Sequence, residues 1–407
     1  MFIIYLLHMF TRNELFLLSS LAIAKFTHIL DFMIMMPLGV SLMKEFGISA
    51  QEFGILVSSY GLSAGATAIV SAFFIDRFDR KRILLLLYGG FILGTLLCAM
   101  SNSYWSLLIA RSATGMFGGL LNTIILSIVA DTFELKKRAT ATGIVMSGMS
   151  AAAAFGVPLG LFFATAFVWQ VPFYAIIVLA IPIWFGLRTF VPLSPDKEKF
   201  SPTIQKTLSN VFGNWNQIRA LFLSACMILG QFMLIPYISP YMVKNIGFSE
   251  FQLIYIYLIG GSVSLITSPI IGRLADKYGH KKIFLWVALG SCIPILAITH
   301  LPTVPIYVAL FFTTLFFIFI GGRAVPAMTM IVSSASPDYR GSFMSFNTAF
   351  QQLAAGAAAL ISGMLIVETE TSFTQYNFVG YLAVGLTFIG MLLASRLYPA
   401  VVAKPTE

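Results

Sequence analysis

One acidic residue, Asp31, differs from the others because it lies deep inside an apolar segment, HILDFMIMMP. The chain holds 16 acidic residues, and the other 15 lie at the ends of apolar segments, in polar loops or at the termini. A carboxylate inside a membrane is unfavourable unless it is paired, protonated or in contact with water. Asp31 is therefore predicted to bind and release a proton during a functional cycle. A static ion pair with an arginine is the alternative.

Basic side chains in apolar segments are the predicted partners of this acid. Arg111 lies midway along its segment and stays protonated. It is predicted either to pair with Asp31 in proton coupling or to hold backbone carbonyls of a neighbouring helix. His28 precedes Asp31 by one helical turn and is predicted to relay protons or to be a hydrogen-bonded bystander. Lys25 is expected to extend to the membrane surface.

The composition explains why these positions count as intramembrane. Of 407 residues, 58% are hydrophobic and 10% are charged, whereas soluble proteins carry about 25% charged residues. This excludes a soluble enzyme, a secreted disulfide scaffold and a disordered chain. A transmembrane helix needs about 20 mostly apolar residues. Twelve such segments are predicted, at 15–43, 52–75, 83–101, 104–130, 140–164, 167–190, 217–243, 251–275, 283–301, 304–333, 342–367 and 376–398.

The basic residues are distributed unevenly between alternate loops. Of 25 Lys and Arg, 20 lie at the termini or in loops that follow even-numbered segments, and three lie within segments. Only Lys44 and Lys244 lie in the opposite loops. The positive-inside rule then predicts a multi-pass protein of the cell (inner) membrane with both termini in the cytoplasm. The net charge of +9 therefore reflects topology, and no nucleic acid partner is expected.

The chain repeats itself at a spacing of 200 residues. The matching residues include Phe32 with Phe232, Gly61 with Gly261, Asp76 with Asp276 and Lys81 with Lys281. The repeat predicts a six-helix bundle over 1–190, a cytoplasmic linker over 191–216 and a second six-helix bundle over 217–407. Parallel six-helix repeats are typical of transporters that move two halves around a site at the membrane midplane.

Several motifs resemble those of the major facilitator superfamily. AFFIDRFDRKR (72–82) and GRLADKYGHKK (272–282) resemble its loop signature, and LIARSATGMFGG (108–119) resembles its fourth-helix motif with a buried arginine. The segment ending in FGVPLG is similar to its fifth-helix antiporter motif, without one glycine of the final pair. Ala72 and Asp79 replace two glycines of the loop signature. The resemblance implies an all-α membrane protein with twelve transmembrane helices in two pseudo-symmetric six-helix bundles, the major facilitator fold.

Two sets of residues gain expected roles in conformational change. Charged loop residues are predicted to pair in one conformation and separate in another. They are Asp76, Arg77, Arg80, Lys81, Asp131, Arg138, Asp276, Lys277 and Arg340. Small residues and a proline of the fifth helix are predicted to form a tight seam that limits proton leak between the halves, or to serve packing alone. They are Gly148, Gly156, Pro158 and Gly160, with the neighbouring alanines 151–154.

The resemblance also implies a central substrate cavity between the two bundles. Candidate lining residues are Phe32, Met35, Asn122, Gln231, Tyr237, Arg323, Asn347 and Gln351. Three intramembrane cations against one acid favour a substrate with an anionic or zwitterionic group near Arg323. Abundant phenylalanine and methionine suit varied amphipathic ligands.

The sequence therefore predicts a secondary active transporter that works by alternating access and exports a small amphipathic compound or drug in exchange for protons. Protonation of Asp31 from outside would weaken its pairing with Arg111 and release the substrate. A monomer in the lipid bilayer, driven by a proton gradient without cofactor or metal, is expected. Enzyme motifs such as a phosphate-binding loop, GxSxG, HExxH and CxxC are absent from the sequence. A proton-coupled symporter importing an anionic metabolite is the first alternative, and a non-transporting lipid-handling or receptor-like scaffold is the second.

Overall fold

The computed structural model describes residues 9–71, 79–192, 211–335, 340–369 and 372–400. Within these ranges, twelve helical segments are long and apolar enough to cross a membrane, which confirms the predicted number. The predicted linker lies largely outside the described residues, between the end of α9 at Phe190 and the start of α11 at Trp215. The division into two domains around it stays a prediction.

The first half contains six spans built from the following elements. These are α2 (Arg12–Ile34), α3 (Gly39–Phe46), α4 (Ala50–Ser71), α5 (Arg80–Ala99), α6 (Tyr104–Thr132), α7 (Leu135–Ala151), the π-helical η2 (Ala152–Gly156), α8 (Val157–Ala166) and α9 (Val171–Phe190). The second half follows the same order. Its elements are α11 (Trp215–Phe232), α12 (Ile235–Tyr241), the π-helical η3 (Met242–Ile246), α13 (Glu250–Tyr278), α14 (His280–Thr299), α15 (Ile306–Ser333), α16 (Arg340–Leu365) and α17 (Tyr376–Ser395).

The first span of each half is interrupted, although the sequence predicted a continuous helix there. Residues 35–38 form turns between α2 and α3, at Pro37, which has no amide hydrogen to continue the helix. The seventh span breaks in the same way between α11 and α12, followed by Pro236. Both halves end this span with a left-handed glycine, Gly47 at φ +61° and Gly247 at φ +87°. The 200-residue sequence repeat is therefore matched by a repeat in the conformation of the backbone.

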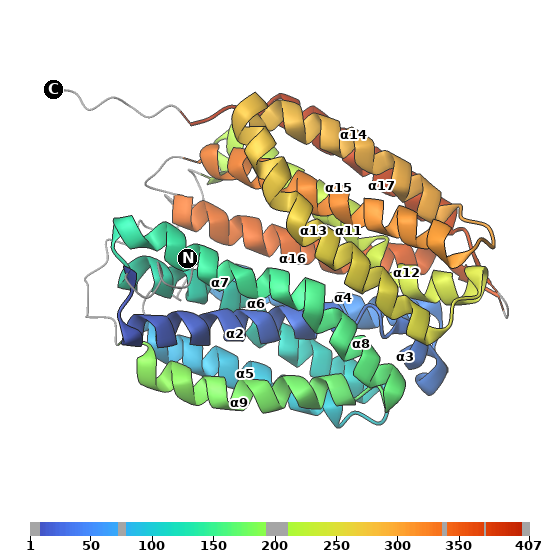
Figure 1. Cartoon of the computed structure of the whole chain (residues 1–407), viewed down its shortest axis with the longest axis horizontal. Coiled ribbons are helices and arrows are strands. Elements are labelled where there is room, and N and C mark those ends of the chain that lie inside the picture. Colours follow the sequence, from blue (N-terminus) through green and yellow to red (C-terminus); the bar gives the residue numbers. More distant parts are fainter. Residues whose placement is uncertain (1–8, 72–78, 193–210, 336–339, 370–371, 401–407) are drawn as a thin grey trace.

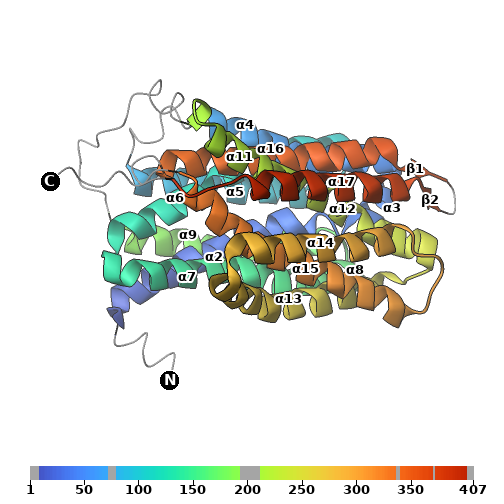
Figure 2. The same cartoon turned by 90° about the horizontal axis from the view of Figure 1, so that it is seen from above.

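The helices run roughly along the long axis of the molecule, and α2 begins at the same end at which α17 finishes (Figures 1 and 2). We call this the terminal end and the opposite one the loop end. A short antiparallel hairpin of β1 (Val367–Glu368) and β2 (Phe373–Thr374) lies at the loop end between α16 and α17. The two halves pack together through α4 against α16 and through α13 against η2 and α8.

Glycines 200 residues apart allow these two close approaches. A Cβ atom on Gly61 of α4 would lie 2.8 Å from the backbone nitrogen of Gly356 in α16. A Cβ atom on Gly261 of α13 would lie 2.8 Å from the carbonyl oxygen of Ala153 in η2. Both distances are shorter than real Cβ contacts, so only glycine fits. Each repeat glycine therefore marks a place where its half touches the other.

At the loop end, three hydrogen bonds cross between the halves. The Tyr237 hydroxyl of α12 donates to the carbonyl oxygen of Ala50 at 3.0 Å, and Glu368 Oε2 accepts from the Ala50 amide at 3.0 Å. Ser41 Oγ donates to Glu250 Oε2 at 3.0 Å. Glu368 also pairs with Lys244. These contacts hold the loop ends of the two halves together in this conformation.

Candidate functional site

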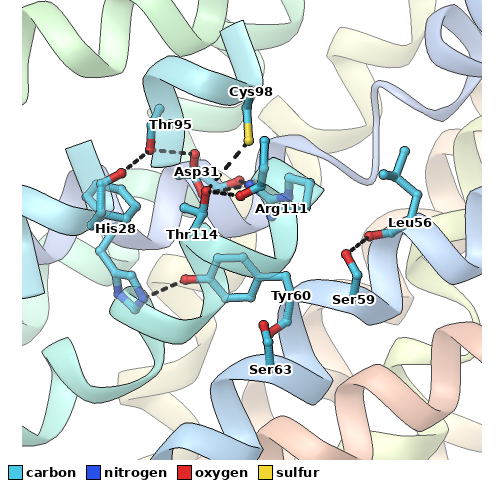
Figure 3. A network of polar contacts seen from close by, with 12 residues as sticks. His28, Asp31, Leu56, Ser59, Tyr60, Ser63, Thr95, Cys98, Arg111 and Thr114 are labelled. Carbon is cyan, nitrogen blue, oxygen red and sulfur yellow. Dashed lines mark hydrogen bonds and ion pairs between the residues drawn. The ribbon is translucent and has the colours of Figure 1, made fainter. Parts of the chain in front are cut away.

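The predicted pair of Asp31 and Arg111 forms a buried ion pair inside the first half. Arg111 Nη1 lies 2.8 Å from Asp31 Oδ2, and the two side chains are 1% and 0% exposed. Thr95 Oγ1 of α5 donates to the other carboxylate oxygen at 3.1 Å. Three helices, α2, α5 and α6, therefore meet at this carboxylate (Figure 3). The ionised form of Asp31 is fully engaged by its neighbours.

Close approach of α5 and α6 positions the pair. A Cβ atom on Gly94 of α5 would lie 2.9 Å from the Cα of Thr114 in α6, so glycine is needed at this crossing. Thr114 donates its hydroxyl to the carbonyl of Ala110 at 2.7 Å, and Cys98 Sγ lies 3.6 Å from that hydroxyl (Figure 3). The guanidinium of Arg111 itself bonds Asp31 through Nη1, and its buried Nε has no hydrogen-bond partner among the described residues.

Tyr60 of α4 links the ion pair to His28. The guanidinium carbon of Arg111 lies 4.6 Å from the centroid of the Tyr60 ring, a cation–π arrangement. The Tyr60 hydroxyl lies 3.0 Å from His28 Nε2 (Figure 3). His28 Nδ1 is buried without a hydrogen-bond partner among the described residues. The structure thus connects His28 to Asp31 through Tyr60 and Arg111.

Lys25 does not extend to the membrane surface, so that expectation is wrong. Its side chain is 2% exposed, and its Nζ donates to Asn122 Oδ1 of α6. The reason is that the amide of Asn122 in α6 offers an acceptor inside the bundle. Lys25 itself lies about two turns of α2 before Asp31, toward the terminal end. Asn122 is partly exposed. The predicted substrate residue Asn122 is therefore held by a buried cation.

Arg323 of α15 lies buried inside the second half, with 2% exposure. Its Nη1 donates to Ser291 Oγ at 3.3 Å and to Thr387 Oγ1 at 3.2 Å, and its Nη2 donates to the carbonyl of Met227 at 3.2 Å. All three acceptors are neutral and come from α14, α17 and α11. Its predicted contact with substrate stays a prediction, since these protein groups occupy its donors here.

Aromatic residues connect the site to the boundary between the halves. The Phe32 ring of α2 lies 5.1 Å from that of Tyr60 and 5.5 Å from that of Phe232, its repeat partner in α11. Phe32 is partly exposed, whereas Met35 is 1% exposed. Because Phe32 follows Asp31 directly, a change at the ion pair can reach the second half through this ring.

The remaining predicted lining residues are split between accessible and enclosed positions. Gln231 and Gln351 are partly exposed, and Gln351 Nε2 donates to Ser224 Oγ at 2.7 Å. Asn347 is 0% exposed, and neither atom of its amide has a hydrogen-bond partner among the described residues. Tyr237 is also 0% exposed and belongs to the closed contact at the loop end.

Those predicted gating residues of the first half that the structure describes lie at the terminal end. Arg80 Nε lies 2.9 Å from Asp131 Oδ2, so α5 and α6 are joined by an ion pair within the same half. Arg138 Nε donates to the carbonyl of Phe133 at 3.3 Å, and Lys81 is partly exposed. Asp76 and Arg77 lie outside the described residues.

In the second half, the corresponding residues are exposed. Asp276 lies 3.6 Å from His280 Nε2, and the Lys277 amine lies 5.1 Å from the Tyr278 ring. Arg340 is exposed at the start of α16. The gating contacts described for both halves stay within one half in this conformation, and pairing across the halves stays a prediction.

The glycines of the antiporter-like motif face α2 and not the second half. A Cβ atom on Gly156 would lie 3.1 Å from Leu30 Cδ1, and one on Gly160 would lie 2.7 Å from Ile34 Cδ1. Gly148 likewise lies against the backbone of Ala22, and Pro158 lies in the first turn of α8. The alanines of the π-helical η2 face the second half instead, at Gly261. The glycines of the motif thus pack against α2, and its alanines form the contact with the second half.

The sequence interpretation missed Tyr60 and Thr95, which complete the site. Both were hidden because tyrosine and threonine are common in transmembrane helices and give no signal in a single sequence. The glycines around them were a usable sign: a Cβ atom on Gly115 of α6 would lie 2.9 Å from the Cα of Tyr60.

Comparison with known proteins agrees with this architecture. The family model of the Major Facilitator Superfamily matches residues 21–221 and 220–407. The uncharacterized MFS-type transporter YceJ of Bacillus subtilis (strain 168) is 24% identical over 355 residues, covering 86% of this chain and 90% of that protein. The putative transporter AraJ of Escherichia coli (strain K12) is 26% identical over 362 residues, covering 85% of each chain.

Solved structures of similar fold are also transporters. A D-xylose-proton symporter superposes with a TM-score of 0.78 at 18% identity, covering 95% of this chain and 98% of that one. A bacterial homolog of the human lysosomal transporter Spinster, in an inward-facing and unoccupied conformation, gives 0.70 at 15% identity and 95% coverage of both chains. At these identities the likeness concerns the fold. The chain belongs to the major facilitator superfamily and is a multi-pass membrane transporter of small molecules, not an enzyme.

Proposed function

We propose that the protein is a proton-coupled antiporter that exports a small amphipathic compound and that Asp31 carries the proton. The observation that supports this is the ion pair of Asp31 and Arg111, which lies buried between two apolar helices, α2 and α6. A buried carboxylate of this kind has two stable states, paired or protonated. Exchange between them is the chemistry that proton coupling needs.

Protonation of Asp31 removes the charge that balances Arg111. The guanidinium then keeps its contact with the Tyr60 ring but loses its ionic partner, and a buried unbalanced cation is unfavourable. A conformation that gives Arg111 access to water, and from which the substrate leaves, becomes favoured. Phe32, next to Asp31 and in contact with Phe232, passes the change to the second half. In this cycle the terminal end faces the cytoplasm, and substrate binding and protonation of Asp31 exclude one another.

The accessible side chains near the boundary suit an amphipathic substrate. Phe32 and Phe232 offer aromatic surface, while Asn122, Gln231 and Gln351 offer hydrogen bonds, and all five are partly exposed. Pockets for small molecules commonly combine an apolar wall with a few polar groups.

Import of an anionic metabolite together with protons is the second candidate function. It is favoured by the two buried cations with neutral hydrogen-bond partners, Lys25 and Arg323. The same acid would carry the proton, so the two functions differ in the direction in which substrate moves relative to protons.

The test is transport by purified protein in liposomes under an imposed pH gradient, with a compound found by thermal-shift screening. Efflux against the proton flow is expected for the wild type. Asp31→Asn should abolish gradient-driven transport while the variant remains folded, and Glu45→Gln, an exposed acid at the loop end, should transport normally. Transport in the direction of proton flow would establish the importer. Gradient-driven transport by Asp31→Asn would refute both.

A further inference from the structure

Lys25 is a buried cation whose charge has no acidic partner among the described residues. Its amine donates to the neutral amide oxygen of Asn122. The intramembrane acid Asp31 is paired with Arg111 and Thr95, and no ion pair joins it to Lys25 among the described residues. An ammonium has three donors, so a single amide leaves it under-satisfied. An unbalanced charge in this setting is unfavourable and usually has a functional role.

The fold itself does not need a cation at this position. The repeat partner of Lys25 is Ala225, on the corresponding span of the second half. The first span of the second half, α11 and α12, has the same interrupted form as α2 and α3, and it has no charged residue at this position. Lys25 is therefore an addition to the shared architecture and not part of its packing.

Lys25 is held by fewer groups than Arg323, although both side chains are 2% exposed. Arg323 is held by groups from three helices of the second half, α11, α14 and α17. Lys25 is held by Asn122 alone among the described hydrogen bonds, and Asn122 is partly exposed. A ligand can reach the ammonium by displacing one amide.

The distance between Lys25 and the nearby aromatic residues indicates how far apart the charged and apolar groups of such a ligand must lie. Phe32 follows Lys25 by seven residues, so the two lie on the same face of α2, about 10 Å apart along its axis. Phe32 in turn contacts Tyr60 and Phe232. An acidic group on Lys25 would thus leave the apolar part of the molecule beside an aromatic cluster at the boundary of the halves.

We propose that Lys25 and Asn122 form the polar end of a binding site for an amphipathic carboxylate. The carboxylate replaces the Asn122 amide on Lys25, and the apolar group lies against the cluster of Phe32, Tyr60 and Phe232. This inference rests on the proposed transport of amphipathic compounds and names their charged group. It moves the expected anionic contact from Arg323 to Lys25.

Three probes that share one skeleton test the proposal: 6-phenylhexanoate, 6-phenylhexanamide and 6-phenylhexylamine. Binding to the purified full-length protein is measured at constant pH by calorimetry and by the rise in melting temperature. The wild type should bind the carboxylate at least tenfold more tightly than the amide and should bind the amine most weakly. Equal binding of the three probes, preference for the amine or no detectable binding would overturn the proposal.

Variants of the protein then test which basic side chain binds the carboxylate. Lys25→Gln should abolish the preference for the carboxylate over the amide, whereas Lys25→Arg should retain it. Asn122→Leu should bind the carboxylate more tightly than the wild type, because no amide then has to be displaced from Lys25. This variant serves if Lys25→Gln does not fold, and unchanged or weaker binding of the carboxylate would overturn the proposal. Arg323→Gln removes the rival cation and should keep the preference for the carboxylate. Loss of the preference in Arg323→Gln, or its persistence in Lys25→Gln, would place the anionic contact elsewhere.

The outcome for Asp31→Asn separates this proposal from the proposed function. That variant should keep its preference for the carboxylate while losing gradient-driven transport. Normal gradient-driven transport would refute the role of Asp31 and leave the site at Lys25 standing. Conversely, if Lys25→Gln keeps the preference while Asp31→Asn loses transport, the proposed function stands and the carboxylate site does not.

Discussion

The ring of Tyr60 lies 4.6 Å from the guanidinium carbon of Arg111, and its hydroxyl lies 3.0 Å from His28. One tyrosine therefore supports the buried cation with its face and holds the histidine with its edge. The two roles can be separated by mutation, because phenylalanine preserves the face and removes the hydroxyl.

Tyr60→Leu is expected to impair the protein more than Tyr60→Phe. A cation–π contact away from water contributes about 2 kcal/mol, and leucine removes it together with part of the volume of the buried ring. The melting temperature of the detergent-solubilised protein and the transport rate should fall clearly for Tyr60→Leu. Tyr60→Phe should stay close to the wild type in stability. If phenylalanine is as harmful as leucine, the hydrogen bond to His28 is the more important contact.

Removal of Arg111 alone should be more destabilising than removal of the whole ion pair. Arg111→Gln leaves the buried carboxyl group of Asp31 without the charge that pairs with it, and breaking a buried ion pair in this way costs about 3–5 kcal/mol. In the double variant Asp31→Asn, Arg111→Gln no charge is left, so part of that stability should return. Thermal unfolding of the two single variants and the double variant measures the coupling. Simple additivity of the losses would show that the pair is not coupled.

Substitution of the glycines at the contact between the halves should block transport without unfolding the protein. A side chain on Gly61 would meet the backbone of α16, 2.8 Å from the nitrogen of Gly356. Gly61→Val should therefore lower the transport rate at least tenfold while each half stays folded. Gly385→Val is the control, because a Cβ atom at Gly385 of α17 meets no atom within 4 Å. Equal transport by both variants would argue against a tight seam.

Loss of the charge on Glu368 should loosen the loop end. Glu368 accepts the amide of Ala50 at the start of α4, where a negative charge is favourable, and it pairs with Lys244. Spin labels at Glu45 and Phe251, exposed residues of opposite halves, report the opening at this end. Glu368→Gln should increase the fraction of molecules in which the two spin labels are far apart. Glu134→Gln, a change at an exposed acid, should not. An unchanged distance distribution would mean that other contacts close this end.

Much of the fold follows from the sequence, because its strongest signals are long. Twelve apolar segments and a 200-residue repeat extend over many residues each, and the structure shows twelve spans with Gly47 and Gly247 in equivalent turns. The interruption at Pro37 was missed, since proline is tolerated within transmembrane helices and gives no certain boundary.

Only part of the site was predictable from the sequence. The approach of Asp31 and Arg111 followed from the scarcity of charge in the apolar segments. The direction of the Lys25 side chain did not follow, because it depends on Asn122, which is 97 residues away in the chain. The side of the antiporter-like motif that faces the second half also depends on how α7, η2 and α8 rotate against α2. Those contacts join residues that are far apart in the sequence, and no periodic pattern in a single sequence indicates them.

Release of protons on substrate binding is the most direct test of the central claim that substrate and proton compete through Asp31. Purified protein in weakly buffered solution with a pH indicator, at a pH where Asp31 is partly protonated, receives a saturating amount of a transported compound. The wild type should release protons into solution, and Asp31→Asn should bind the compound and release none. Equal release by both proteins, or none by the wild type across the pH range in which it transports, would contradict the account.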